Sequence, residues 1–292
     1  MESSPPQQDI TDGSEDDKKS LASKMALYDL KIARSTLASI SHKPTWTIAD
    51  TSSFDCMHYD GDAALDLCAH KLALQPDQRV LDIGSGFSAT GRFLASKYQV
   101  RVTGVELQPE IHELAETITR RNAEERVVKN VRSVNADFLT LTEDEIYGQD
   151  ARVPFDQALS ILCIMHLPQS ARRPFFEQAY RYLKVGGRIY LEDYYERKPL
   201  TADERTKLRN LVACTFLPTK SEYSATVAEA GFDAIEFEDV TEHWRDILVA
   251  RANKYKAKEN KSPDLEKFYD TVAKLYVAGN LGGVRLTAMK GA

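Results

Sequence analysis

The sequence predicts an α/β fold built around a mainly parallel β-sheet. Through the middle of the chain, strand-like apolar runs alternate with amphipathic connections of helix length, which is the order that parallel βαβ units require. A glycine-rich turn, Gly84-Ser85-Gly86, follows the first of these strands. The 292 residues, 42% of them hydrophobic, suffice for one large core or two modest ones.

Residues 1–19 contain two apolar residues and no periodicity, so we expect a disordered tail. From Leu21 to Ile40 apolar residues recur at helical spacing, and an irregular stretch with several aromatic residues follows. We expect residues 20–60 to form an N-terminal helical lid. The remaining residues, 61–292, are expected to form one ligand-binding domain.

Strands and helices are predicted in turn over that domain. The predicted strands are Arg79–Ile83, Val100–Val105, Val131–Val134, Phe155–Ile161, Arg188–Leu191, Ala234–Val240 and Val284–Met289. The predicted helices are one capped by Asp62, then Pro109–Arg126, Gln169–Leu183 and Lys220–Ala230. The turn Leu183–Arg188 is expected to end a helix at a glycine. Residues 241–280 are expected to be a helical insertion before the last strand, with the charge run Arg251–Lys261 on a solvated face.

Composition excludes several classes of protein. The chain has 38 Lys and Arg against 44 Asp and Glu, a formal net charge of −6, which disfavours a nucleic-acid or membrane-surface partner. The longest apolar run, Ala158–Leu167, is about half of the ~20 residues that a membrane span needs. The four cysteines are widely spaced, which indicates reduced thiols and no metal site: Cys56, Cys68, Cys163 and Cys214. We expect a soluble cytoplasmic protein without integral membrane association or a bound metal.

The segment Val80–Leu94 carries the strongest functional signal. Gly84 and Gly86 let the backbone turn tightly and approach a ligand, and a helix N-terminus with free N–H groups follows at once. The segment matches the G-x-G-x-x-G/A dinucleotide pattern, and Glu106 lies where an acidic group can hold ribose hydroxyls. These features fit a nicotinamide dehydrogenase, an S-adenosylmethionine enzyme, or a glycine-rich turn without a ligand.

Two carboxylates favour S-adenosylmethionine. Asp82 precedes the glycines inside the strand end, where a dinucleotide site usually has apolar packing and where a carboxylate can receive the ammonium of an amino acid. Asp137, with Phe138 beside it, follows the third strand and can meet an adenine amino group. At this point the sequence, from Tyr59 to Met289, resembles the class I S-adenosylmethionine-dependent methyltransferases.

The resemblance implies a Rossmann-like, mostly parallel seven-stranded sheet with an antiparallel C-terminal hairpin and the cofactor across the strand ends. Glu106 would bind the ribose, Asp137 the adenine, and the Gly84–Gly86 loop the methionine part. The family's frequent third glycine is replaced here by Ser88. The full predicted set of S-adenosylmethionine contacts is Tyr59, Asp82, Gly84, Ser85, Gly86, Glu106, Leu107, Asp137, Phe138 and Ser160.

A finer resemblance points to the small-amine N-methyltransferases, especially the phosphoethanolamine type. It is carried by Ser160–Gln169, by the LKVGGRIYLEDYY stretch and by Glu238–Lys261. Sterol and fatty-acyl C-methyltransferases share the entry His58–Gly61 and stay open as an alternative. A nicotinamide dehydrogenase and a non-catalytic cofactor-binding module are the remaining alternatives.

His166 is the candidate catalytic residue, because it follows the fourth strand and an imidazole can take the proton of an attacking amine. A structural histidine is the competing interpretation. In the phosphoethanolamine family the histidine pairs with a tyrosine, but no tyrosine of this sequence matches that N-terminal position, and Tyr28 and Tyr59 are candidates for lid or cofactor contacts. Tyr194 and Tyr195 are candidates to hold a methylammonium group by cation–π contact, or else ordinary packing residues.

The departures from the phosphoethanolamine pattern concern the substrate. Ile161-Leu162 stands where that family has an Arg-Asp pair, and Ala213–Thr215 stands near its basic and aromatic phosphate contacts. A phosphate would lose donors worth about 1.5–3 kcal/mol each. We therefore expect methylation of a small-molecule acceptor, an amine nitrogen on a substrate without phosphate.

Overall fold

The computed structural model describes residues 30–56, 58–148 and 152–291. The predicted tail 1–19 and the helical pattern over Leu21–Tyr28 lie outside the described residues. Within the described ranges no helix is long and apolar enough to cross a membrane.

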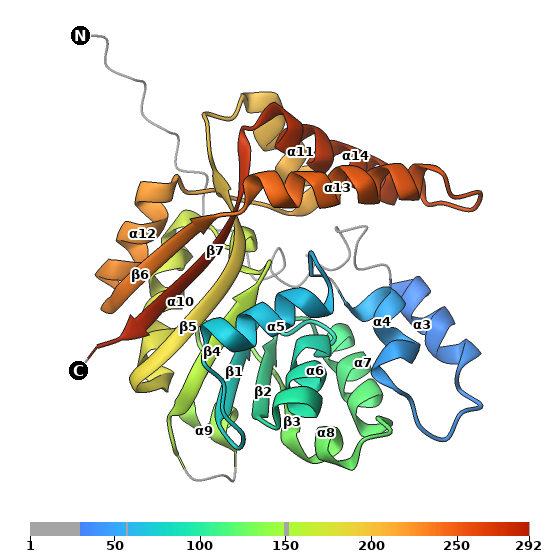
Figure 1. Cartoon of the computed structure of the whole chain (residues 1–292), viewed down its shortest axis with the longest axis vertical. Helices are drawn as coiled ribbons and strands as arrows, with labels where there is room; N and C mark the ends of the chain where they lie inside the picture. Colours follow the sequence, from blue (N-terminus) through green and yellow to red (C-terminus); the bar gives the residue numbers. More distant parts are fainter. Residues whose placement is uncertain (1–29, 57, 149–151, 292) are drawn as a thin grey trace.

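One seven-stranded sheet forms the centre of the molecule, in the order β3-β2-β1-β4-β5-β7-β6 (Figure 1). Neighbours from β3 to β5 run parallel, whereas β7 is antiparallel to both β5 and β6. The strands are β1 (Arg79–Ile83), β2 (Arg101–Glu106), β3 (Val131–Asn135), β4 (Phe155–Ile161), β5 (Leu183–Glu196), β6 (Phe232–Asp239) and β7 (Leu281–Lys290). The predicted mostly parallel sheet with an antiparallel C-terminal hairpin is thus confirmed.

Helices cover both faces of the sheet because strand side chains alternate between the faces. Val80 packs with Leu65 and Phe93 on one face, whereas the next residue, Leu81, packs with Phe175 on the other. The covering helices are α5 (Asp62–Lys71) and α6 (Ala89–Tyr98) on the first face, and α9 (Glu143–Tyr147), α10 (Gln169–Tyr182) and α12 (Lys220–Glu229) on the second.

Three helices near the C-terminus form an arm across one end of the sheet (Figure 1). They are α11 (Ala202–Val212), α13 (Thr241–Lys256) and α14 (Pro263–Ala278). Trp244 of α13 is fully buried in the core of this arm. The same apolar cluster includes Tyr59, Met165 and Tyr194, so the arm packs directly on residues that follow the strands.

The N-terminal helices α3 (Leu30–Ser39) and α4 (Ile48–Asp55) pack beside α7 (Pro109–Arg120) through Leu37 and Trp46. We expected an irregular stretch after Ile40, and α4 corrects that expectation. Its start is a capping box in which Thr47 and Asp50 satisfy each other's backbone N–H groups. The Thr-x-x-Asp spacing was the available signal.

Other boundaries also differ from prediction. Gly61, not Asp62, is the N-cap of α5. The predicted helix Pro109–Arg126 ends at Arg120, and a separate short helix, α8 (Glu125–Asn130), follows. The predicted glycine turn before β5 is wrong, because β5 begins at Leu183 directly after α10. Gly186 (φ +77°) lies inside β5, where the pairing with β4 shifts register and the extra residues form a bulge.

Candidate active site

The glycine-rich loop lies at the end of β1. Gly84 and Gly86 have φ values of +76° and +53°, in the left-handed region that favours glycine. A Cβ atom at Gly84 would also overlap the Cys163 side chain, which packs against the loop from the segment after β4. The loop conformation and its neighbour therefore both require glycine at this position.

Two carboxylates from adjacent strands face this loop. Glu106 Oε2 accepts a hydrogen bond from the Gly86 N–H (2.9 Å), and its Oε1 accepts one from the Gln108 N–H (2.8 Å). Asp82 is only 3% exposed, and its Oδ2 has no hydrogen-bond partner among the described residues. Burial and, next, the Glu106 charge raise the pKa of Asp82 to about 7. Burying a carboxylate without a partner is unfavourable, so a cation bound here would stabilise the ionised form of Asp82.

A cavity opens between this loop and the arm, with about 840 Å³ of atom-free space, part of it open to solvent. Its polar floor includes Asp82, the 84–86 loop and Thr90. The facing wall is mainly apolar and aromatic, and it consists of Tyr59, Ile161, Leu162, Met165, His166, Tyr194, Leu248, Arg251, Phe268 and Tyr269. Asp55, His58, Phe87 and Ala89 complete the lining. Residues from both halves of the chain thus enclose one space.

The tautomer of His166 follows from its contacts. Its Nδ1 lies 3.1 Å from the Ala213 carbonyl oxygen, which can only accept, so Nδ1 donates and carries the proton. Its Nε2 is buried without a partner among the described residues. Burial lowers the pKa of His166 below 6.5. The imidazole is therefore neutral, and its residue lines the cavity with a buried Nε2 lone pair that no described residue engages.

A second histidine, His58, lines the same cavity. Its Nε2 lies 3.2 Å from Thr90 Oγ1, and burial lowers its pKa to about 4. Next to it, the Tyr59 and Tyr194 hydroxyls share a hydrogen bond, and their rings stack at 6.5 Å between centroids. Tyr59 thus pairs with Tyr194 and not with His166.

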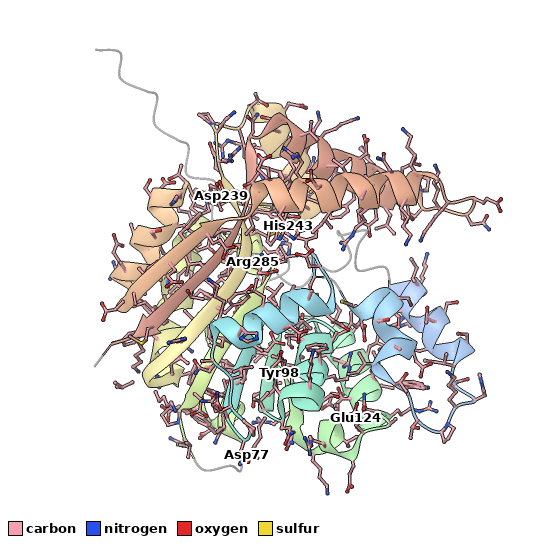
Figure 2. The ribbon with its side chains drawn as sticks, viewed as in Figure 1. Asp77, Tyr98, Glu124, Asp239, His243 and Arg285 are labelled. Carbon is pink, nitrogen blue, oxygen red and sulfur yellow. The ribbon has the colours of Figure 1, made fainter. Side chains whose placement is uncertain are left out.

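A charged network holds the segment before α5 in place. Asp60 Oδ2 accepts from Arg285 Nη2 of β7 (3.1 Å) and lies 2.6 Å from His243 Nε2 of α13. Arg285 also donates through Nε to Glu192 Oε1 (2.9 Å). Figure 2 shows His243 and Arg285 where the arm meets the sheet. The position of Tyr59 is therefore set by β7 and α13 together.

Comparison with known proteins decides the family. The model of the mycolic acid cyclopropane synthetase family matches residues 51–280, a span that contains every residue lining the cavity. The chain belongs to this family of S-adenosylmethionine-dependent methyltransferases. The sequence-based expectation of a class I methyltransferase is confirmed.

Relatives of this methyltransferase act on different acceptors. It is 24% identical over 198 residues to a phosphoethanolamine N-methyltransferase of Plasmodium falciparum, covering 68% of each chain. It is 23% identical over 238 residues to a methoxy mycolic acid synthase of Mycobacterium tuberculosis, covering 74% of this chain and 77% of that one. A Haemonchus contortus phosphoethanolamine N-methyltransferase crystallised with S-adenosyl-L-methionine has a TM-score of 0.73 at 17% identity. That match covers 94% of this chain and 60% of the nematode chain.

The structure brings seven of the predicted site residues into the cavity lining of the methyltransferase, and these are Tyr59, Asp82, Gly84, Ser85, Gly86, His166 and Tyr194. Glu106 contacts the loop without lining the cavity. Ser160 Oγ donates to the Ile83 carbonyl (2.8 Å), and the Leu107 carbonyl accepts from Asn135 (3.1 Å).

Three other predicted residues lie away from the lining. Asp137 is partly exposed after β3, and its Oδ1 accepts from the Leu139 N–H (3.0 Å). Phe138 is buried against Phe175, with ring centroids 5.3 Å apart. Tyr195 points to the opposite face of the sheet from Tyr194 and packs on Phe237 at 5.1 Å. Of the two tyrosines, Tyr194 therefore stays a candidate for a cation–π contact, whereas Tyr195 is a packing residue.

Sequence reasoning did not single out His58, Arg251, Phe268 or Tyr269 as site residues. We expected the charge run that begins at Arg251 to be solvated, but Arg251 is partly buried in the cavity wall. The spacing Trp244, Leu248, Arg251 was a usable signal, because it places the arginine on the buried stripe of α13. Across the described ranges, no group of His, Cys, Asp and Glu is arranged to hold a metal ion.

The unpartnered Asp82 carboxylate fits the ammonium of S-adenosylmethionine, and Asp82→Asn tests this. We expect cofactor affinity to fall about 10- to 100-fold, the loss of one charge-assisted contact, in an isothermal titration with S-adenosylhomocysteine. Wild-type affinity should rise between pH 6 and 7.5, because Asp82 (pKa about 7) must ionise to bind a cation. Affinity of the variant should be flat over that range.

Asp82→Asn should have the opposite effect on the stability of the cofactor-free protein, which we expect to increase. The pKa of Asp82 is raised on folding, so its favourable contribution is present below pH ~4 and is lost as pH rises through about 7. At pH 8 we expect the Asp82→Asn protein to melt at least ~3 °C above wild type, the shift given by ~1 kcal/mol. Asp77→Asn, at the opposite end of β1 (Figure 2), is the matched control and should change neither quantity. Unchanged affinity in the Asp82→Asn protein would contradict the assignment.

Proposed function

We propose that this protein transfers the methyl group of S-adenosylmethionine to the nitrogen of a small, mainly apolar amine without a phosphate group. The observation that carries the proposal is the neutral His166 imidazole, whose Nε2 lone pair has no partner in the cavity lining. An attacking amine must be uncharged, and such a base can take the proton that an ammonium has to lose.

Methyl transfer needs little covalent chemistry from the protein. The cofactor supplies a sulfonium methyl group: the nitrogen–carbon bond forms as the carbon–sulfur bond breaks, and the electron pair stays on sulfur. His166 receives the proton at Nε2, and the aromatic wall, with Tyr59, Tyr194 and Tyr269, can hold a methylammonium group by cation–π contact. Alignment of the two reactants in one closed space provides the remaining acceleration.

The cofactor contacts are part of the proposal. Asp82 would hold the ammonium, the Gly84–Gly86 loop the methionine part, Glu106 the ribose and Asp137 the adenine. The shared edge of the sheet supports this placement, because β1, β2 and β3 are adjacent, parallel strands and each of these carboxylates lies near the end of one of them. We further propose a cytoplasmic location, which the four free cysteines support.

Two measurements test the acceptor. Purified protein with methyl-labelled cofactor and a panel of amines should yield labelled N-methyl products, and no labelled amine from the panel or from a cell lysate would contradict the proposal. Isothermal titration with phosphoethanolamine should show no binding tighter than millimolar, because Arg251 is the one Lys or Arg side chain among the described cavity-lining residues. Micromolar binding of phosphoethanolamine would contradict the proposal that the substrate has no phosphate group.

A lipid or sterol C-methyltransferase is the second candidate, favoured by the apolar side chains of Ile161, Leu162, Met165, Leu248 and Phe268 in the cavity wall. Sorting labelled lysate products by polarity separates the two candidates. Small polar products support the amine, whereas label in the lipid fraction supports carbon methylation.

A further inference from the structure

Arg251 places a guanidinium in the cavity wall. Its Nη2 donates to the His58 carbonyl oxygen (3.2 Å), and its Cζ lies 5.2 Å from the centre of the Tyr59 ring. Both contacts hold the head group beside the segment that precedes α5. The planar guanidinium is thus fixed at the boundary between the arm and the cofactor-binding loop.

This cation has no acidic partner within the described ranges, where Arg251 forms no ion pair. Two carboxylates of the adjoining segment are engaged elsewhere: Asp55 pairs with Arg92 at 2.7 Å, and Asp60 pairs with Arg285. A partly buried charge without a counter-ion is unfavourable, and the remaining guanidinium N–H groups have the fork geometry that matches a carboxylate. An anion in the cavity would supply the counter-ion that Arg251 lacks among the described residues.

The cavity also contains the opposite charge without a partner. Asp82 lies at its floor with a free Oδ2, and Arg251 lies in its wall. Asp55, the other carboxylate of the lining, is neutralised by Arg92. One free acidic group and one free basic group in a single cavity are complementary to a zwitterion, which carries both an ammonium and a carboxylate.

We infer that Arg251 binds a carboxylate inside the cavity and thereby selects zwitterionic over simply cationic ligands. That carboxylate belongs either to the methionine part of the cofactor or to the acceptor amine. The acceptor case rests on the proposed function, in which Asp82 already holds the cofactor ammonium and Arg251 alone meets the carboxylate of the acceptor. The cofactor case does not depend on which acceptor is used.

Titration with matched probes tests the inference. S-adenosylhomocysteine and its decarboxylated counterpart are titrated into wild type, Arg251→Gln and Arg251→Lys. If the cofactor supplies the carboxylate, Arg251→Gln should bind S-adenosylhomocysteine about 10- to 100-fold more weakly and the decarboxylated compound equally well. Arg251→Lys should fall between, because it keeps the charge and loses the fork.

If S-adenosylhomocysteine binding stays within twofold of wild type, the acceptor probes decide. Wild type saturated with S-adenosylhomocysteine should then bind 6-aminohexanoate at least 10-fold more tightly than hexylamine, and Arg251→Gln should remove the difference. Arg245→Gln, a partly exposed residue of α13 that pairs with Glu242 and Asp246 and does not line the cavity, is the control and should match wild type throughout.

The inference is overturned if Arg251→Gln has an unchanged melting temperature and the same affinity ratios as wild type for both probe pairs. These pairs are S-adenosylhomocysteine with its decarboxylated counterpart, and 6-aminohexanoate with hexylamine. Failure of the proposed function looks different: the protein would methylate no amine and yet would still lose S-adenosylhomocysteine affinity in Arg251→Gln.

Discussion

His166→Asn is expected to lower kcat for amine methylation about 10²–10³-fold at pH 7, within the range that general base catalysis contributes. The asparagine amide can still donate to the Ala213 carbonyl, as Nδ1 does at 3.1 Å, so the local structure should persist. What disappears is the free Nε2 lone pair. Initial rates with labelled cofactor measure the loss.

The pH profile separates a base from a structural role. Burial lowers the pKa of His166 below 6.5, so wild-type kcat/KM should fall only as the pH drops below that range and the imidazole becomes protonated. In His166→Asn, kcat/KM should instead rise about tenfold per pH unit toward the pKa of the free amine. Exposed His70→Ala is the control. If His166→Asn keeps the wild-type kcat, the protein is still a methyltransferase, but His166 is not its general base.

Asp55→Ala is expected to destabilise the fold by about 3–5 kcal/mol, the effect of removing one partner of a buried ion pair. Asp55 and Arg92 have side chains that are 2% and 0% exposed, and they meet at 2.7 Å. Without the carboxylate, a guanidinium remains buried between α4 and α6. Thermal unfolding should show a melting temperature lower by roughly 10 °C.

A double substitution distinguishes the buried charge from lost packing. Asp55→Leu combined with Arg92→Met removes both charges and should be less destabilised than Asp55→Ala alone. Asp203→Ala, which breaks an exposed pair with Lys207, should change the free energy of unfolding by less than ~1 kcal/mol. A double variant as unstable as the sum of its single variants would contradict the explanation.

Most of the sheet could be predicted from the sequence because its signals are local. The alternation of apolar runs and helices located all seven strands, and β1 and β4 begin and end at the predicted residues. β5 was predicted too short. Its first residues contain Gly186-Gly187, which read as a turn, and pairing with β4 and β7 extends the strand through them. Pairing of distant segments overrode local propensity there.

The family was also determined by the sequence alone. The sequence has two glycines after an apolar strand and acidic residues at the ends of successive strands. This pattern indicates a cofactor-binding loop, because the backbone geometry of such a loop depends on residues that are close in sequence.

Only the tertiary structure decided which side chains meet in the cavity. Tyr194 and Tyr195 are adjacent and chemically alike, yet alternation along β5 sends one into the cavity and the other into the core. His58 and Arg251 are 193 positions apart in the chain and become neighbours because the arm packs over the strand ends. Such contacts depend on packing between distant elements, which a pattern within one segment does not encode.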